Sequence, residues 1–270
     1  MSLFSIFGKS NTVYFPCCIT YFKFREGFEL YKNIFSKLGI SFGILDKQNC
    51  CGLEALEAGY DIEARMLARK NFDVFKEKKI NSIITNSPDC YKMFLQNYPE
   101  LLPDWNIKVI NLWKLILEKL KDSRLIKNKA IEIVTYNDNC YLGRYCNIYE
   151  EPREILRLLG YEIKELDNSK ENSFCCGSCG GLPRINQELA NKIAKEKILQ
   201  AKRVNVKKMI VIGFDSYDLL KNNSQLMPQG KEIEILEFSD VLGNALGIKT
   251  SSKLTEKLKE EFIKQEQFKS

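Results

Sequence analysis

The sequence predicts an α/β fold built from two tandem, related α/β domains with parallel sheets. Short β-rich apolar runs alternate with longer helical patterns along the 270 residues, which is typical of parallel sheets covered by helices. The tripeptide Cys-Cys-Gly occurs twice, at residues 50–52 and 175–177. Cysteines follow expected strands in both halves, so we expect the carboxyl ends of the strands to gather them at one edge of each sheet.

The first half is expected to form a domain over residues 11–125. Runs rich in β-branched and aromatic residues predict its strands, and apolar residues at helical spacing predict its helices. The expected strands are residues 12–15, 41–45, 82–85 and 108–110. The expected helices are residues 28–38, 62–78, 90–97 and 112–120.

The second half is expected to form a domain over residues 130–248, after a polar stretch at 121–129. Pro152 suits the first turn of its first helix. The expected strands are residues 131–136, 162–165, 208–212 and 232–236. The expected helices are residues 152–159, 187–203, 217–221 and 239–246. The Lys/Glu-rich residues 251–270 predict a charged helix or tail, lying on the surface or docking on a partner.

The two halves also match each other. Superposing them on the Cys-Cys-Gly tripeptides places Cys18 on Cys140 and residues 87–91 on residues 213–217. Agreement at three separate places indicates an internal duplication with pseudo-twofold related domains.

The amino-acid composition limits the kinds of catalysis and metal binding that the chain can support. Ten cysteines and no histidine largely exclude imidazole acid–base catalysis and imidazole metal ligation. A core-forming chain without a signal peptide or membrane-span pattern predicts reduced thiols in the cytoplasm. Soft, all-sulfur ligation favours iron-sulfur clusters or zinc. The net charge of +6 comes from residues interleaved with acids, so no nucleic-acid partner is expected.

The cysteines after the strands form two candidate metal sites. A single cysteine is often only a small core residue, but adjacent thiols that reach one site require a loop built for ligation. The first candidate set is Cys18, Cys50, Cys51 and Cys90. The second is Cys140, Cys175 and Cys176, with Cys179 or Cys146 as a fourth ligand. Structural zinc is the alternative occupant.

This arrangement resembles the CCG, or cysteine-rich domain, family, typified by the catalytic B subunit of heterodisulfide reductase. The family also includes iron-sulfur subunits of lactate, glycolate and glycerol-3-phosphate dehydrogenases. Its motif is a lone cysteine, Cys-Cys-Gly and then Cys-x-x-Cys, repeated twice in a chain. Here the last element is Ser87-x-x-Cys90 in the first half and Gly213-x-x-Ser216 in the second, and Cys17 is additional.

The resemblance implies an iron-sulfur electron-transfer subunit of an oxidoreductase complex, with one or two 4Fe-4S clusters. The family's noncubane clusters draw on five cysteines at each site, and the departures above favour ordinary clusters. Such a subunit would relay electrons between a flavin-containing dehydrogenase or reductase and a downstream acceptor. Other iron-sulfur subunits could take part, at the inner face of the membrane through partners. The alternatives are a catalytic, heterodisulfide-type reductase subunit and a zinc-thiolate structural protein.

Overall fold

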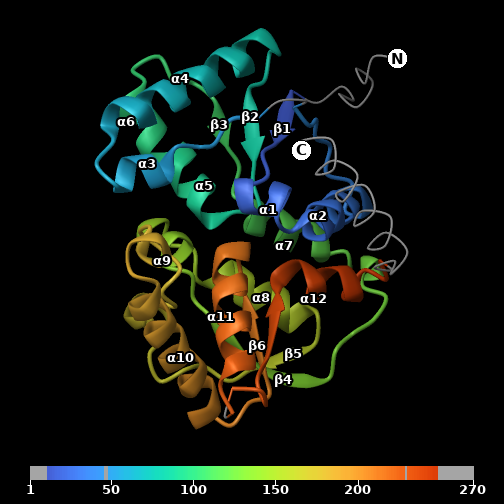
Figure 1. Ribbon diagram of the computed structural model, residues 1–270. Helices are drawn as coiled ribbons and strands as arrows, with labels where there is room; N and C mark the ends of the chain where they lie inside the picture. The colour runs from blue at the N-terminus through green and yellow to red at the C-terminus, as the bar shows by residue number, and fades with distance from the viewer. Residues whose placement is uncertain (1–10, 46–47, 229, 249–270) are drawn as a thin grey trace, which may run out of the picture.

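The computed structural model describes residues 11–45, 48–228 and 230–248. It contains two α/β halves stacked on each other, with the N-terminal half above the C-terminal half in Figure 1. All the strands pair in parallel. The predicted fold class is therefore confirmed. The charged segment predicted at 251–270 lies outside the described residues.

The first sheet has the strand order β1-β2-β3. Its strands are β1 (Thr12–Tyr14), β2 (Ser82–Ile84) and β3 (Lys108–Val109). The strand predicted at residues 41–45 is reduced to one parallel bridge between Val13 and Gly43. Two backbone hydrogen bonds hold this bridge, Tyr14 N to Gly43 O and Gly43 N to Thr12 O, both 2.8 Å long. A glycine at the pairing position contributes no side chain to the sheet, which weakens a strand there.

The four helices predicted for the first half form close to their predicted positions, and three short helices at Cys18–Phe22, Leu53–Glu57 and Tyr98–Leu101 form where none was predicted. The bounds are α1 (Cys18–Phe22), α2 (Arg25–Lys37), α3 (Leu53–Glu57), α4 (Asp61–Glu77), α5 (Pro88–Lys92), α6 (Tyr98–Leu101) and α7 (Leu112–Leu120), with a π-helical turn η1 (Met93–Asn97). The helix predicted from residue 90 begins at Pro88, because the Ser87 side chain caps it by accepting from the Cys90 N–H.

The second sheet has the order β5-β4-β6-β7. Its strands are β4 (Glu132–Asn137), β5 (Tyr161–Ile163), β6 (Lys208–Val211) and β7 (Glu234–Glu237). The α-helices are α8 (Glu150–Leu158), α9 (Leu182–Ile185), α10 (Gln187–Arg203), α11 (Phe214–Leu226) and α12 (Phe238–Ala245). The short helical turns are η2 (Ser123–Leu125), η3 (Tyr141–Tyr145) and η4 (Lys170–Asn172). The helix predicted at 217–221 is longer than expected and begins directly after Gly213.

Alternating strand residues divide the core into layers. In β1, Val13 packs with α4, whereas Tyr14 packs with α2. In β6, Met209 packs with α10 and Ile210 joins the layer that contains Tyr14. That middle layer is continuous across both halves, where α2 packs on α12 and α7 packs on α8. Each large apolar side chain buried there contributes roughly 1.5–3 kcal/mol. The two halves are therefore joined by a shared core.

Within the described residues, no helix has both the length and the apolar character that crossing a membrane would require.

Candidate metal centres

The first site forms where three loops meet at the carboxyl end of the first sheet. Cys17 and Cys18 follow β1, Cys50 and Cys51 precede α3, and Cys90 lies in α5 after β2. Their thiols interact in succession, from Cys18 to Cys50, then Cys51, Cys90 and Cys17. The four predicted ligands of the first half therefore lie together, and a fifth thiol joins them.

Glycine and two polar side chains hold the Cys-Cys loop of the first site against α4. Gly52 has φ +93°, and a Cβ there would lie 3.4 Å from the Ala64 carbonyl oxygen; only glycine adopts that backbone readily. Asn71 donates to the Cys50 carbonyl at 2.9 Å, and the Tyr98 hydroxyl donates to the Cys51 carbonyl at 3.0 Å. The loop is fixed by its backbone, which leaves both thiols free to face the site.

Hydrogen bonding among the thiols separates their pKa values. Hydrogen bonds from Cys18 and Cys51 hold the pKa of Cys50 far below its ordinary value, and Gly52 N–H assists at 3.5 Å. The same hydrogen bond with Cys50, together with burial, raises the pKa of Cys18. The loop therefore favours a thiolate at Cys50, and a metal that binds the remaining thiols must displace their protons.

The second site lies at the carboxyl end of the second sheet. The sulfur atoms of Cys140, Cys175 and Cys179 all lie within 4.8 Å of one another, and the Cys140 and Cys179 sulfurs are 2.7 Å apart. Cys176 interacts with Cys179 and Cys175. Its sulfur lies 3.4 Å from the Oγ of Ser216, the residue matched to Cys90. Four thiols therefore converge, with a hydroxyl at the position where the first half supplies a thiol.

The second Cys-Cys loop is built like the first. Gly177 has φ +91°, and a Cβ there would lie 2.7 Å from the Ala190 carbonyl oxygen in α10. Hydrogen bonds with Cys175 and Cys179 lower the pKa of Cys140 to about 5, with burial opposing them. The hydrogen bond with Cys140 raises the pKa of Cys175, but those with Cys176 and Cys179 lower it. The net effect is a pKa of about 6, below the ordinary value.

Cys146 does not join the second site. Burial raises the pKa of its thiol to about 11, and the charged group that acts on it is Lys92 rather than another cysteine. Its side chain packs on the core shared by the two halves. Between the two fourth ligands suggested by the sequence, the structure brings Cys179 to the site.

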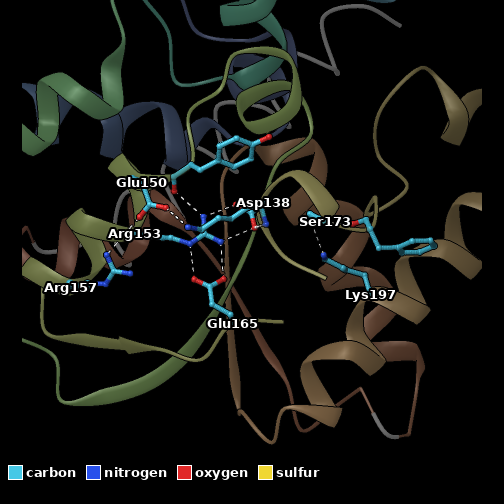
Figure 2. Close-up of polar contacts among 10 residues, drawn as sticks. Asp138, Glu150, Arg153, Arg157, Glu165, Ser173 and Lys197 are labelled. Atoms are coloured by element: carbon cyan, nitrogen blue, oxygen red, sulfur yellow. Dashed lines mark hydrogen bonds and ion pairs between the residues drawn. The ribbon is translucent and has the colours of Figure 1, made fainter. Parts of the chain in front are cut away.

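Buried charged side chains lie in the second half near the loop that leads to Cys175, and Figure 2 shows their polar contacts. Arg153 is fully buried and makes two hydrogen bonds to Asp138, at 2.7 and 2.8 Å, and two to Glu165. Lys197 of α10 is also fully buried and donates to the Ser173 hydroxyl at 3.1 Å. Ser173 lies on the loop that leads into Cys175, so a cation sits directly behind the second Cys-Cys pair.

A cavity of about 410 Å³ separates the first site from the loops of the second half. Four first-site cysteines line it, together with the carboxylates of Glu54, Asp89 and Asp215 and the Arg184 side chain. Burial and the nearby Asp215 raise the pKa of Asp89 to about 8. A small molecule or part of a bound cluster in this cavity would contact Cys17, Cys18, Cys50 and Cys51.

The donor atoms fit a thiolate-bound cluster. Both sites offer four or more sulfur atoms at strand ends, on loops whose glycines permit a close backbone approach. Soft sulfur ligands of this number suit iron-sulfur clusters or zinc. Cys17 is the candidate ligand that sequence reasoning left out. Its position beside Cys18 could have indicated that it is a ligand, but a sequence does not show which of two adjacent thiols faces a site.

Comparison with known proteins places these sites in a wider group. The model of the CCG cysteine-rich domain family matches residues 12–95 and 134–213. The chain is 32% identical over 178 residues to the probable iron-sulfur-binding oxidoreductase FadF of Bacillus subtilis, covering 65% of this chain and 25% of that protein. It is 27% identical over 252 residues to the D subunit of the dihydromethanophenazine:CoB–CoM heterodisulfide reductase of Methanosarcina acetivorans, covering 90% and 61%.

A third relative has nearly the same extent as the matched region. Lactate utilization protein A 2 of Bacillus cereus is 26% identical over 244 residues, covering 86% of this chain and 97% of that protein. By contrast, the chain spans only about a quarter of FadF and three-fifths of the heterodisulfide reductase polypeptide.

Proposed function

Because the chain belongs to the CCG cysteine-rich domain family, we propose that it is an iron-sulfur electron-transfer subunit of an oxidoreductase complex. The observation that carries the proposal is the pair of thiol clusters at equivalent edges of the two sheets. The relatives support it, since FadF is described as iron-sulfur-binding and the Methanosarcina relative is part of a heterodisulfide reductase. A bound cluster would supply one-electron chemistry.

The first site would hold a 4Fe-4S cluster on Cys18, Cys50, Cys51 and Cys90. Ser87 stands where the family motif has a cysteine. Its hydroxyl accepts a hydrogen bond from the Cys90 N–H and donates one to Asp89 at 3.0 Å, so it serves as a helix cap. Cys17 interacts with Cys90 from the β1–α1 loop. We assign Cys17 as an additional thiol that protects or completes this site.

The second site would hold a cluster on Cys140, Cys175, Cys176 and Cys179. Gly213 has no ligand atom, and the Ser216 hydroxyl is a harder, less acidic ligand than a thiolate. Cys179 replaces the missing thiol ligand, because the glycine-rich loop after Cys176 lets it fold back toward Cys140. The chain's residues thus provide a fourth thiolate from a new place in the sequence.

Electrons would enter or leave through other proteins. A flavin-containing dehydrogenase or reductase is the proposed donor and a further redox protein the proposed acceptor. The chain's role in that relay is to position the two sites and set their electrostatic surroundings.

A catalytic disulfide reductase is the second candidate, and the cavity beside the first site favours it. The cavity reaches Cys17, Cys18, Cys50 and Cys51 from solvent, so a small disulfide could approach there. Oxidation of the dithionite-reduced protein by a small aromatic disulfide, with one thiol pair formed per two electrons lost, would support this activity. No reoxidation by disulfides, with rapid reoxidation by a protein or dye acceptor, would support the relay.

Metal analysis tests the main proposal. Protein purified without oxygen should contain iron and acid-labile sulfide in equal amounts and absorb visible light. Zinc without sulfide would contradict the proposal and favour a structural thiolate site instead.

A further inference from the structure

Lys197 is a buried cation without a carboxylate partner. It is the eleventh residue of the 17-residue helix α10 and is fully buried. Its Nζ donates to the Ser173 hydroxyl at 3.1 Å. Among the described residues, no ion pair joins it to an acidic side chain within 4.0 Å. Figure 2 shows the ammonium beside Ser173 and apart from the Arg153 network.

An ammonium group in such a position needs a negative charge nearby, because burying an isolated charge is costly. Burial lowers the pKa of Lys197 to about 8, and the groups that favour its charged form are Cys176, Asp138 and Cys175. Asp138 is already engaged by two hydrogen bonds from Arg153. The thiols of Cys175 and Cys176 are therefore the remaining acidic groups that act on Lys197. Arg144 also holds this loop, but its side chain is exposed to solvent.

The first half has a neutral residue at the same place. Asn71 is the eleventh residue of α4, which also has 17 residues, and it donates to the Cys50 carbonyl oxygen. The helices correspond throughout, with buried alanines at the fourth and eighth positions of each. Position for position, an amide stands behind the first Cys-Cys pair and an ammonium behind the second.

Other charged groups lie near both sites. The carboxylates of Glu54, Glu57 and Asp89 line the cavity beside the first-site cysteines. Arg184, the cation that acts on Cys50, is largely exposed and paired with Glu54 at 2.8 Å. Solvent screens an exposed pair of this kind, whereas a fully buried charge acts through a low dielectric. Asp89 also acts on Cys140, Asp215 interacts with Cys176, and Lys92 pairs with Glu57 at 3.6 Å, so carboxylates lie near both sites. The difference that remains is the residue behind each Cys-Cys pair, a neutral amide at the first site and a fully buried ammonium at the second.

We propose that Lys197 is the built-in counter-ion of the second site and makes an iron-sulfur cluster there easier to reduce than one at the first site. An added electron increases the negative charge of a cluster by one, and a nearby ammonium stabilises that charge. An electron delivered by an external one-electron donor would then come to rest at the second site. This inference rests on the proposed function.

A redox titration of the full-length holoprotein, monitored by electron paramagnetic resonance with dithionite as reductant, tests it. Cys51→Ala and Cys176→Ala variants assign the signals to the first and second sites. In the wild type we expect the second site to be reduced first. In Lys197→Gln, which keeps a donor for Ser173, we expect the equilibrium constant for reducing the second site to fall about tenfold, or about 59 mV. The first-site potential should not change.

Two further variants serve as controls. Lys195→Met removes an exposed lysine from the same helix and should leave both potentials unchanged. Lys197→Arg keeps the charge and should retain most of the second-site potential, which a purely structural role would not require.

The outcomes separate this inference from the function on which it rests. Wild-type protein without iron and sulfide would contradict the proposed function itself. Clusters at both sites with the first one easier to reduce, or an unchanged second-site potential in a fully loaded Lys197→Gln variant, would overturn the role of Lys197 alone. The wild-type order needs no substitution, so it tests the inference even if the variants do not fold.

Discussion

The two halves share a backbone plan but differ in the residues at two equivalent positions, one behind the Cys-Cys loop and one at a helix cap. The first half uses amides: Asn71 lies behind the Cys-Cys loop, and Asn111 caps α7 by accepting from the Lys114 N–H. The second half places ionisable groups at the same positions, with Lys197 in α10 and Glu237 as the cap of α12. The difference shows that the strand-end loops kept their geometry while the charges around them diverged.

The cysteines themselves differ in a related way. In each half a hydroxyl stands where the family motif has a thiol, Ser87 in one and Ser216 in the other. In each half another thiol lies close to the remaining ones, Cys17 beside Cys90 and Cys179 beside Cys140. The two additional thiols come from different loops, which indicates that each site was rebuilt separately.

The largest expected effect comes from removing one thiol of each Cys-Cys pair. Cys51→Ala and Cys176→Ala should each lower iron and sulfide by about half, because the sites use separate loops and a cluster needs its full set of thiolates. Iron per chain, with spectra of each variant, measures this. Loss of all the iron in either variant would mean that the sites share one cluster.

A smaller effect should separate Cys179 from Cys146. Cys179→Ser should lower iron content by up to one cluster and leave the first site intact, because Cys179 lies among the second-site thiols. Cys146→Ser should change nothing in the cluster spectra, since that thiol packs on the core. The opposite result would mean that the second loop rearranges when metal binds.

Breaking the buried charge network of the second half should cost stability that has no counterpart in the first. Arg153→Met leaves Asp138 buried without its ion-pair partner, although it still accepts from the Lys170 N–H, and this costs about 3–5 kcal/mol of the free energy of unfolding. Urea denaturation of the metal-free protein measures it. Arg124→Met, which removes an exposed pair with Asp122, is the control and should change the stability little. Equal effects of the two substitutions would show that the network is not the cause.

The smallest effect concerns the two helix caps and depends on pH. Burial raises the pKa of Glu237 to about 7 from 4.5, against the hydrogen bonds it accepts from Ser239. The folded protein therefore binds this proton more tightly than the unfolded chain, and stability should fall by up to about 3 kcal/mol as pH rises from 4.5 through 7.

Substitution at the two caps separates this pH effect from capping itself. Glu237→Gln should flatten the pH dependence of the unfolding free energy in that window. Asn111→Ala should cost about 1 kcal/mol at every pH, since it removes a neutral cap. A wild-type stability that rises between pH 4.5 and 7, and rises less in Glu237→Gln, would contradict the assignment of a raised pKa to Glu237.

Much of the fold could be predicted from local sequence patterns. Helices α7 and α10 have their predicted bounds, because amphipathic spacing and a capping asparagine specify them. The strand predicted at 41–45 is only a single bridge, because Gly43 takes the pairing position. The hydrophobic pattern of a segment does not show how many of its residues pair with a neighbouring strand. The convergence of the cysteines followed from parallel-sheet topology.

The finer features of the sites depended on three-dimensional packing. Spacing could not decide between Cys146 and Cys179, because the choice depends on how the glycine-rich loop turns back toward Cys140. Nor could it show that Lys197 is buried, since a lysine on a helix rich in Lys and Glu normally faces water. These two features, the turn of the loop that carries Cys179 and the burial of Lys197, both lie at the second candidate site.

The continuous core between the halves has a consequence for kinetics. With α2 packed on α12 and α7 on α8, the two cysteine sites belong to one solid body rather than to two lobes that swing apart. Electron exchange between them would then be tunnelling through a fixed medium, insensitive to solvent viscosity and free of any gating motion. The overall rate of electron transfer through such a protein would be limited by its encounters with partner proteins.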